Sequence, residues 1–138
     1  MFLWTKEFSV GVKELDQQHQ HLFDLLNSLV VAVEKGESLV ELMLLLDGVS
    51  NYNLYHLSSE EEYMKRLDCE SQDHLSAHAW YRKNAKQRIN GVRENLRAGI
   101  LKAPELHEVI MFVGSWHVEH IFKVDKTYTA CFNDHGLV

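Results

Sequence analysis

The sequence contains few of the residues that break or cross-link a chain. Proline occurs once in 138 residues and the glycines are scattered, so no linker, repeat or low-complexity tract divides it. A single domain covering residues 1–138 is expected. Cysteine occurs only at Cys69 and Cys131, which is too few for a disulfide scaffold. We therefore expect two reduced thiols.

The sequence also lacks basic runs and long apolar runs. Its 14 Lys and Arg face 20 Asp and Glu, giving a formal net charge of −6, which excludes nucleic acid and anionic membranes as primary partners. The longest apolar runs, residues 29–33 and 42–46, are far shorter than the roughly 20 residues that cross a bilayer. The first residues do not have the pattern of a signal peptide, so we expect a cytoplasmic protein.

Four segments place apolar residues at the three- and four-residue spacings of amphipathic helices. An irregular arm, residues 1–12, precedes them, and the predicted helices cover residues 13–35, 39–67, 72–98 and 104–130. Short loops between such helices favour antiparallel neighbours, so the predicted fold is an all-α, up-down-up-down four-helix bundle. On this plan the two cysteines lie on opposite corners of one end, and residues after about 130 are frayed.

Histidine is abundant, with nine residues, and several of them fall on the apolar stripes. At about 1.5 Å of rise per residue, all four helices bring histidine to one layer, about 3 to 16 Å from the end where the first helix begins. The layer holds His19, His56 with Glu60, His74 with His78, and His120. Burying such groups without partners would cost several kcal/mol, so the layer predicts a metal site. Zinc prefers four ligands, and this larger set favours two metals.

Spacing does not identify a second carboxylate for this site. Neither residue three or four positions after His120 is acidic. Asp125 follows by five positions, which on an ideal helix rotates it about 140° away from His120. Asp125, Glu61 and Glu119 therefore remain competing candidates.

Five motifs of the chain resemble those of the hemerythrins, in family order and over almost the whole length. They are residues 8–12 (FSVGV), 15–23 (LDQQHQHLF), 56–61 (HLSSEE), 74–78 (HLSAH) and 116–121 (WHVEHI), the last leading to Asp125. Within that family the chain resembles the single-domain bacterial hemerythrins. Every ligand position of that family is occupied here, by His19, His56, Glu60, His74, His78, His120 and Asp125.

The resemblance implies two iron ions as the cofactor. It assigns His74, His78 and His120 to one iron, and His19 and His56 to the other. Glu60 and Asp125 then bridge the pair together with a solvent-derived oxygen, which resolves the choice among the three carboxylates. In two six-coordinate irons this set leaves one open position, on the iron with fewer histidines.

A single open position accepts dioxygen but has no room for an organic substrate as well. The resemblance therefore implies reversible O2 binding for storage, delivery or sensing, by a protein that is not an enzyme, and it leaves room for an unidentified protein that receives the O2. The alternative is a di-iron enzyme that reduces peroxide or nitric oxide; a bundle that binds stray zinc is the third reading. Ferritin-like sites use Glu-x-x-His motifs, which are absent here with inward geometry.

The resemblance also implies a ligand pocket beside the metals. Its residues are Phe23, Leu57, Trp116, His117 and Tyr81. Leu57 and Tyr81 stand where the family commonly has Phe. The Tyr81 phenol would be able to donate a hydrogen bond or an electron near the metals if its hydroxyl points inward. His117 stands where Leu is usual. It either faces the pocket, where it would speed autoxidation, or turns toward a neighbouring helix or solvent.

Overall fold

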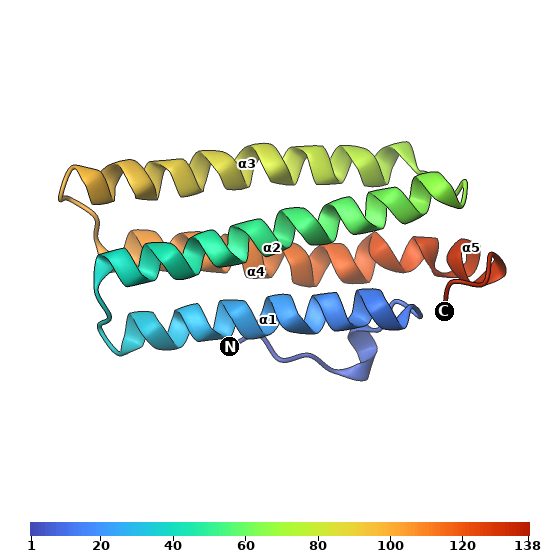
Figure 1. Ribbon diagram of the computed structural model, residues 1–138, viewed down its shortest axis with the longest axis horizontal. Coiled ribbons are helices and arrows are strands. Elements are labelled where there is room, and N and C mark those ends of the chain that lie inside the picture. The colour runs from blue at the N-terminus through green and yellow to red at the C-terminus, as the bar shows by residue number, and fades with distance from the viewer.

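The computed structural model describes residues 1–138 as a bundle of four long helices with no strand (Figure 1). The elements are η1 (Lys6–Phe8), α1 (Lys13–Glu34), α2 (Leu39–Arg66), α3 (Gln72–Arg97), α4 (Ala103–Lys123), η2 (Asp125–Tyr128) and α5 (Thr129–Asp134). The long helices run side by side in alternating directions, which confirms the predicted all-α, up-down-up-down bundle. None of the helices has the length and apolar content needed to span a membrane.

Serine side chains cap the starts of two of the long helices, and glycines follow the ends of two. The Ser38 and Ser71 side chains accept hydrogen bonds from the backbone N–H groups three residues later, at 3.2 and 3.4 Å, and so cap α2 and α3. Gly36 and Gly99 follow α1 and α3 with φ of +72°, a conformation that glycine adopts without steric cost. The resulting turns are short, and they enforce antiparallel neighbours.

The buried apolar residues form two clusters on either side of the histidine layer. The larger cluster includes Leu22 and Leu57, and the smaller one includes Leu15 and Met64. Along α1, His19 lies between a residue of each cluster, since Leu15 precedes it and Leu22 follows it. The polar layer is therefore closed on both sides by close-packed apolar side chains, which exclude bulk water from it.

The N-terminal arm packs against the bundle. The Phe2 backbone N–H donates to the Asn27 side chain at 2.8 Å, and the Asn27 amide donates back to the Phe2 carbonyl at 2.7 Å. The Phe2 ring lies against α4 at Gly114, where a Cβ atom would meet the ring at 2.0 Å. Gly114 is therefore required for the close approach of the arm.

Replacing Gly114 by alanine is expected to displace the Phe2 ring and to lower the free energy of unfolding by about 1–3 kcal/mol. Gly91 is a matched control, because a Cβ atom on it would meet nothing within 4 Å. Gly91→Ala is expected to raise the free energy of unfolding by about 0.5–1 kcal/mol through helix propensity alone. Urea titration of both variants measures the difference; equal changes would mean that the arm does not pack on Gly114.

The last long helix ends earlier than the predicted boundary at residue 130. Helix α4 stops at Lys123, and the φ of Val124, −119°, departs from the α-helical value of about −63°. The chain then forms η2 and turns into α5. The expectation of frayed residues after about 130 was wrong, because Phe132 is fully buried in the smaller apolar cluster. An apolar anchor in α5 holds this segment on the bundle.

The expectation of two reduced thiols was also wrong. Cys69, in the turn between α2 and α3, forms a disulfide with Cys131 of α5. The sequence prediction places the two cysteines on opposite corners because it continues the last helix straight to residue 130. The break at Val124 lets α5 turn toward the α2–α3 turn, and both lie at the same end of the bundle (Figure 1).

Candidate metal centre

Each long helix contributes a histidine to one buried layer near the end of the bundle where α1 begins. Helix α1 supplies His19 and α4 supplies His120. Helices α2 and α3 each contribute a pair four residues apart, which places both members on one face. With Asp125 from η2 these are seven side chains, none more than 4% exposed: His19, His56, Glu60, His74, His78, His120 and Asp125.

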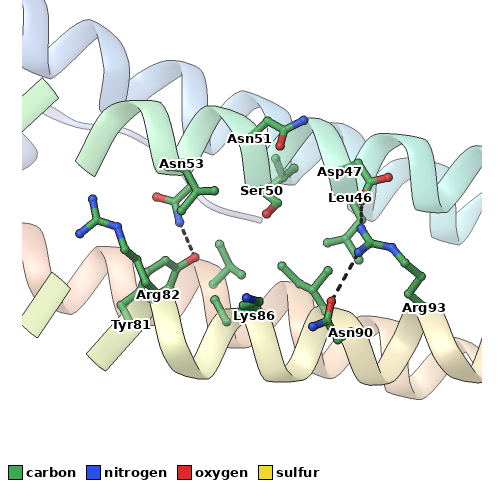
Figure 2. Close-up of a pocket in the computed structure, with 15 residues that line it drawn as sticks. Leu46, Asp47, Ser50, Asn51, Asn53, Tyr81, Arg82, Lys86, Asn90 and Arg93 are labelled. Atoms are coloured by element: carbon green, nitrogen blue, oxygen red, sulfur yellow. Dashed lines mark hydrogen bonds and ion pairs between the residues drawn. The ribbon is translucent and has the colours of Figure 1, made fainter. Parts of the chain in front are cut away.

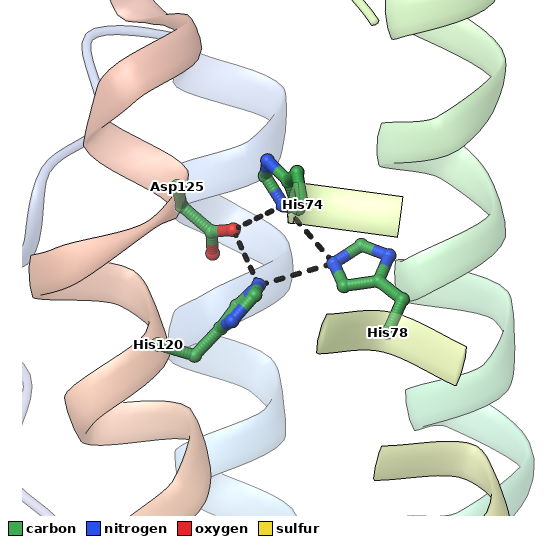
Figure 3. Close-up of side chains that lie close together, drawn as sticks. All are labelled: His74, His78, His120 and Asp125. Carbon is green, nitrogen blue, oxygen red and sulfur yellow. Dashed lines mark hydrogen bonds and ion pairs between the residues drawn. The ribbon is translucent and has the colours of Figure 1, made fainter. Parts of the chain in front are cut away.

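Three histidines and one carboxylate form a first group (Figure 3). The Nε2 atom of His78 lies 3.1 Å from the Nε2 atoms of both His74 and His120. The Oδ1 atom of Asp125 is 3.0 Å from Nε2 of His74 and 2.9 Å from Nε2 of His120. All four ligand atoms lie within 4.8 Å of one another, so one ion could contact them all.

A second group combines His19, His56 and Glu60 with the same Asp125. The Oδ2 atom of Asp125 lies 3.2 Å from Nε2 of His19, and Oε1 of Glu60 lies 2.7 Å from Nε2 of His56. These ligand atoms are also within 4.8 Å of one another. Asp125 directs one oxygen to each group, so the arrangement is that of two adjacent cation positions sharing a carboxylate.

The break after α4 brings Asp125 into this layer. On a continued helix Asp125 would lie about 140° around the axis from His120. The φ of Val124, −119° instead of the α-helical value of about −63°, and the tighter η2 turn the carboxylate back toward His120. The two other candidate carboxylates lie elsewhere: Glu61 pairs with His78 from outside the layer, and the Glu119 side chain is 65% exposed beside Lys123.

Two of the imidazoles are held in orientation by hydrogen bonds from Nδ1, the ring nitrogen that faces away from the layer. Nδ1 of His56 donates to the Gln18 side chain at 2.7 Å, and Nδ1 of His78 donates to Glu61 at 2.9 Å. In the neutral imidazole each Nε2 atom then carries a lone pair, and that of His56 points at Oε1 of Glu60, another acceptor, 2.7 Å away. Such an arrangement is repulsive unless a cation lies between, and it is how metal-binding histidines are oriented. The donor set therefore fits bound metal.

Gln18 is a site residue that the sequence does not predict. It is buried beside His19 in the sequence, but its partner, His56, lies on a different helix. No spacing rule within one helix identifies a hydrogen bond between helices. A buried glutamine next to a candidate ligand is the only signal the sequence offers.

Comparison with known proteins decides the family. A family model described as the hemerythrin HHE cation binding domain matches residues 10–131. The chain belongs to the hemerythrin family. Hemerythrins bind a di-iron centre, and the two ligand groups that share Asp125 fit such a centre.

Individual hemerythrins match along nearly their whole length. The chain is 31% identical to a bacteriohemerythrin of Methylococcus capsulatus, over 96% of this chain and 98% of that protein. It is 26% identical to a bacteriohemerythrin of Clostridium acetobutylicum, over 93% and 98%. A crystal structure of a leucine-to-alanine mutant hemerythrin superposes with a TM-score of 0.77 at 30% identity, covering 95% of this chain and 96% of that one.

The electrostatics of the hemerythrin site favour charge pairing between its own side chains. Burial alone would raise the pKa of Asp125, but hydrogen bonds from His120, His19 and His74 hold it well below its usual value. Burial alone would lower the pKa values of His19 and His74, but the ion pairs with Asp125 raise both. The carboxylate is thus already ionised, as a metal ligand must be.

Four of the five expected pocket residues are buried: Phe23, Leu57, Tyr81 and His117, whereas Trp116 is partly exposed. Tyr81 does not direct its hydroxyl at the metal ligands. Its hydroxyl oxygen accepts a hydrogen bond from the Asn53 amide at 2.5 Å, at one end of a groove between α2 and α3 (Figure 2). Burial raises the pKa of Tyr81, so the phenol stays protonated. It packs against Trp116 with ring centroids 4.2 Å apart, and Trp116 stacks on His120 at the same separation.

His117 turns into the bundle. It is 1% exposed, and its ring lies 5.0 Å from that of Tyr81. Nδ1 donates to the Val113 carbonyl at 2.7 Å, which leaves Nε2 as an acceptor without a hydrogen-bond partner. Burial holds the pKa of His117 well below its ordinary value, so the ring is neutral. Of the orientations that the sequence leaves open, exposure to solvent is wrong, whereas packing toward the pocket and toward the neighbouring helix α3 both agree with the structure.

Proposed function

We propose that this protein binds dioxygen reversibly at a di-iron centre. The observation that carries the proposal is the buried layer of five imidazoles and two carboxylates, arranged as two groups that share Asp125. Two ferrous ions bound there would supply the O2 chemistry. We assign His74, His78 and His120 to one position and His19 and His56 to the other, with Glu60 and Asp125 between them.

The protein side chains determine which ligands the iron ions would have, and they exclude water from the centre. Neutral imidazoles outnumber carboxylates in the layer, and nitrogen ligands suit ferrous iron better than an all-carboxylate set does. Apolar clusters close the layer on both sides, and Leu57 and Phe23 are at most 1% exposed. Water and protons are kept from the centre, which favours release of O2 unchanged over its reduction. Storage, delivery and sensing all require this equilibrium, and the proposal covers the three.

The test is the visible spectrum of iron-loaded, anaerobically reduced protein during repeated cycles of air and argon. Reversible binding predicts an absorption band that appears with O2 and disappears under argon over several cycles. Permanent oxidation in the first cycle would overturn the proposal. So would steady consumption of added peroxide without an O2-dependent band, which is the behaviour of a peroxide-reducing enzyme.

His117 is expected to increase the rate at which the reduced protein autoxidises in air. Its unpaired Nε2 is a neutral acceptor that can hold a water molecule near the centre, in a pocket otherwise lined mainly by apolar side chains. Replacing His117 by leucine removes it at similar size and is expected to slow autoxidation about tenfold, the equivalent of one hydrogen bond of about 1.4 kcal/mol. The decay of the O2-dependent band gives the rate. His21→Leu is the control, since His21 is exposed; equal rates in all three proteins would exclude a pocket role for His117.

A further inference from the structure

A second cluster of metal-ligating side chains lies at the surface, where the α2–α3 turn meets α5. Nδ1 of His135, just after α5, is 4.0 Å from the sulfur of Cys69 and 4.0 Å from the sulfur of Cys131. The ligand atoms of these three residues lie within 4.8 Å of one another. The cysteines are partly exposed and His135 is exposed, whereas the seven donors of the di-iron layer are buried. The cluster is therefore accessible to solutes.

Two cysteine sulfurs and an imidazole are ligands that zinc prefers. Zinc bonds of about 2.3 Å to sulfur and about 2.0 Å to nitrogen place tetrahedral ligands about 3.5–3.8 Å apart. The His135 nitrogen already lies within about half an ångström of that spacing from both sulfurs. The Cα atoms of the two cysteines are 6.0 Å apart, so side-chain rotation alone could separate the sulfurs that far.

We propose that reduction of the Cys69–Cys131 disulfide converts this corner into a zinc site formed by Cys69, Cys131 and His135. A dithiol reductant supplies two electrons and two protons, the S–S bond breaks, and the reductant leaves as its own disulfide. Binding of Zn2+ releases the two thiol protons to solvent. The Nδ1 proton of His135, which is donated to the Cys131 carbonyl at 2.8 Å in the oxidised protein, moves to Nε2. Water completes the fourth position.

The zinc and the disulfide make the same connection. Either one ties the α2–α3 turn, which leads into His74, to α5, which follows the Asp125 segment. A reduced protein that takes up zinc thus keeps a cross-link beside the di-iron layer. When the environment becomes reducing, a zinc cross-link replaces the disulfide, and α5 stays attached to the α2–α3 turn.

Cd2+ is the probe, because its bonds to thiolate absorb in the ultraviolet whereas its bonds to imidazole and carboxylate do not. Iron-loaded protein is reduced with a phosphine, which is oxidised with oxygen from water and adds no thiol, and is then desalted anaerobically. The expected result is a thiolate-to-cadmium band that saturates at one Cd2+ per chain and is weakened by competition from a large excess of Zn2+. Protein with the disulfide intact should give no band. Absence of the band after reduction would overturn the proposal.

His135→Ala tests the third ligand. His135 is exposed and both cysteines remain, so the variant should fold as the parent does. It is expected to weaken Cd2+ binding by at least about tenfold, since losing even a supporting partner of a ligand costs that much. His107→Ala is the matched control, an exposed histidine at the start of α4, and should bind as the parent does. Unchanged affinity in His135→Ala would mean that the thiols act alone. The iron absorption, recorded in the same samples, reports on the di-iron centre separately.

Discussion

Replacing Asp125 by asparagine is expected to leave the protein unable to hold two iron ions per chain. Asp125 is the one residue common to both ligand groups, with Oδ1 near His74 and His120 and Oδ2 near His19. Asparagine offers a neutral oxygen on one side and an N–H donor on the other, which faces an imidazole or a metal. Loss of a direct ligand should exceed the 10–100-fold loss of affinity that follows removal of a partner that only supports a ligand. Iron per chain after gel filtration is expected to fall to one or below.

Glu119→Gln makes the same change of charge on the last turns of α4. The Glu119 side chain is 65% exposed and pairs with Lys123, so this variant should retain both irons. Circular dichroism of both variants without metal checks that the bundle has formed. Full iron content in Asp125→Asn would mean that the carboxylate does not bridge the two positions, and the assignment of the whole second group would have to change.

The histidine layer could be predicted because it depends on quantities that a sequence contains. Helical rise and the spacing of apolar residues set the depth and the face of His19, His56, His78 and His120. Side chains on one face at one depth must meet in a bundle. The burial of His117 could not be decided in this way, because spacing alone allows either Trp116 or His117 to share the inward stripe with His120.

The position of Asp125 could not be obtained in this way. It depends on a break of the helix at Val124, and no glycine or proline at that point marks the break. Periodicity assumes a straight helix and rotates Asp125 away from His120. Only the resemblance to hemerythrins chose it over Glu61 and Glu119.

The same assumption explains the error about the cysteines. A straight last helix places Cys131 on the far corner from Cys69, whereas the broken one brings α5 to the α2–α3 turn. Contacts between distant segments depend on such changes of direction. The Gln18–His56 hydrogen bond, which joins two helices, was beyond prediction for a related reason: it depends on how the side chains of two helices interlock.

Removing the disulfide is expected to lower the free energy of unfolding by about 4 kcal/mol. The bond joins residues 62 positions apart, and it restricts the unfolded chain by closing a loop of that length. Cys69→Ser with Cys131→Ser frees that loop. Guanidinium titrations of parent and variant at equal iron content give the difference in the free energy of unfolding. A zinc chelator is present so that no metal cross-link replaces the bond.

The decrease in the free energy of unfolding should arise because the unfolded chain gains conformational freedom. The metal site of the folded protein should remain unchanged. Helix α5 remains attached through Phe132, which is fully buried, and η2 through Tyr128, which is 3% exposed. The iron absorption of the double variant should therefore match that of the parent. A reductant should destabilise the parent to the level of the variant and leave the variant unaffected. If the variant lost its iron spectrum while keeping its stability, the disulfide would act by positioning Asp125 in the folded protein, and the entropic explanation would be wrong.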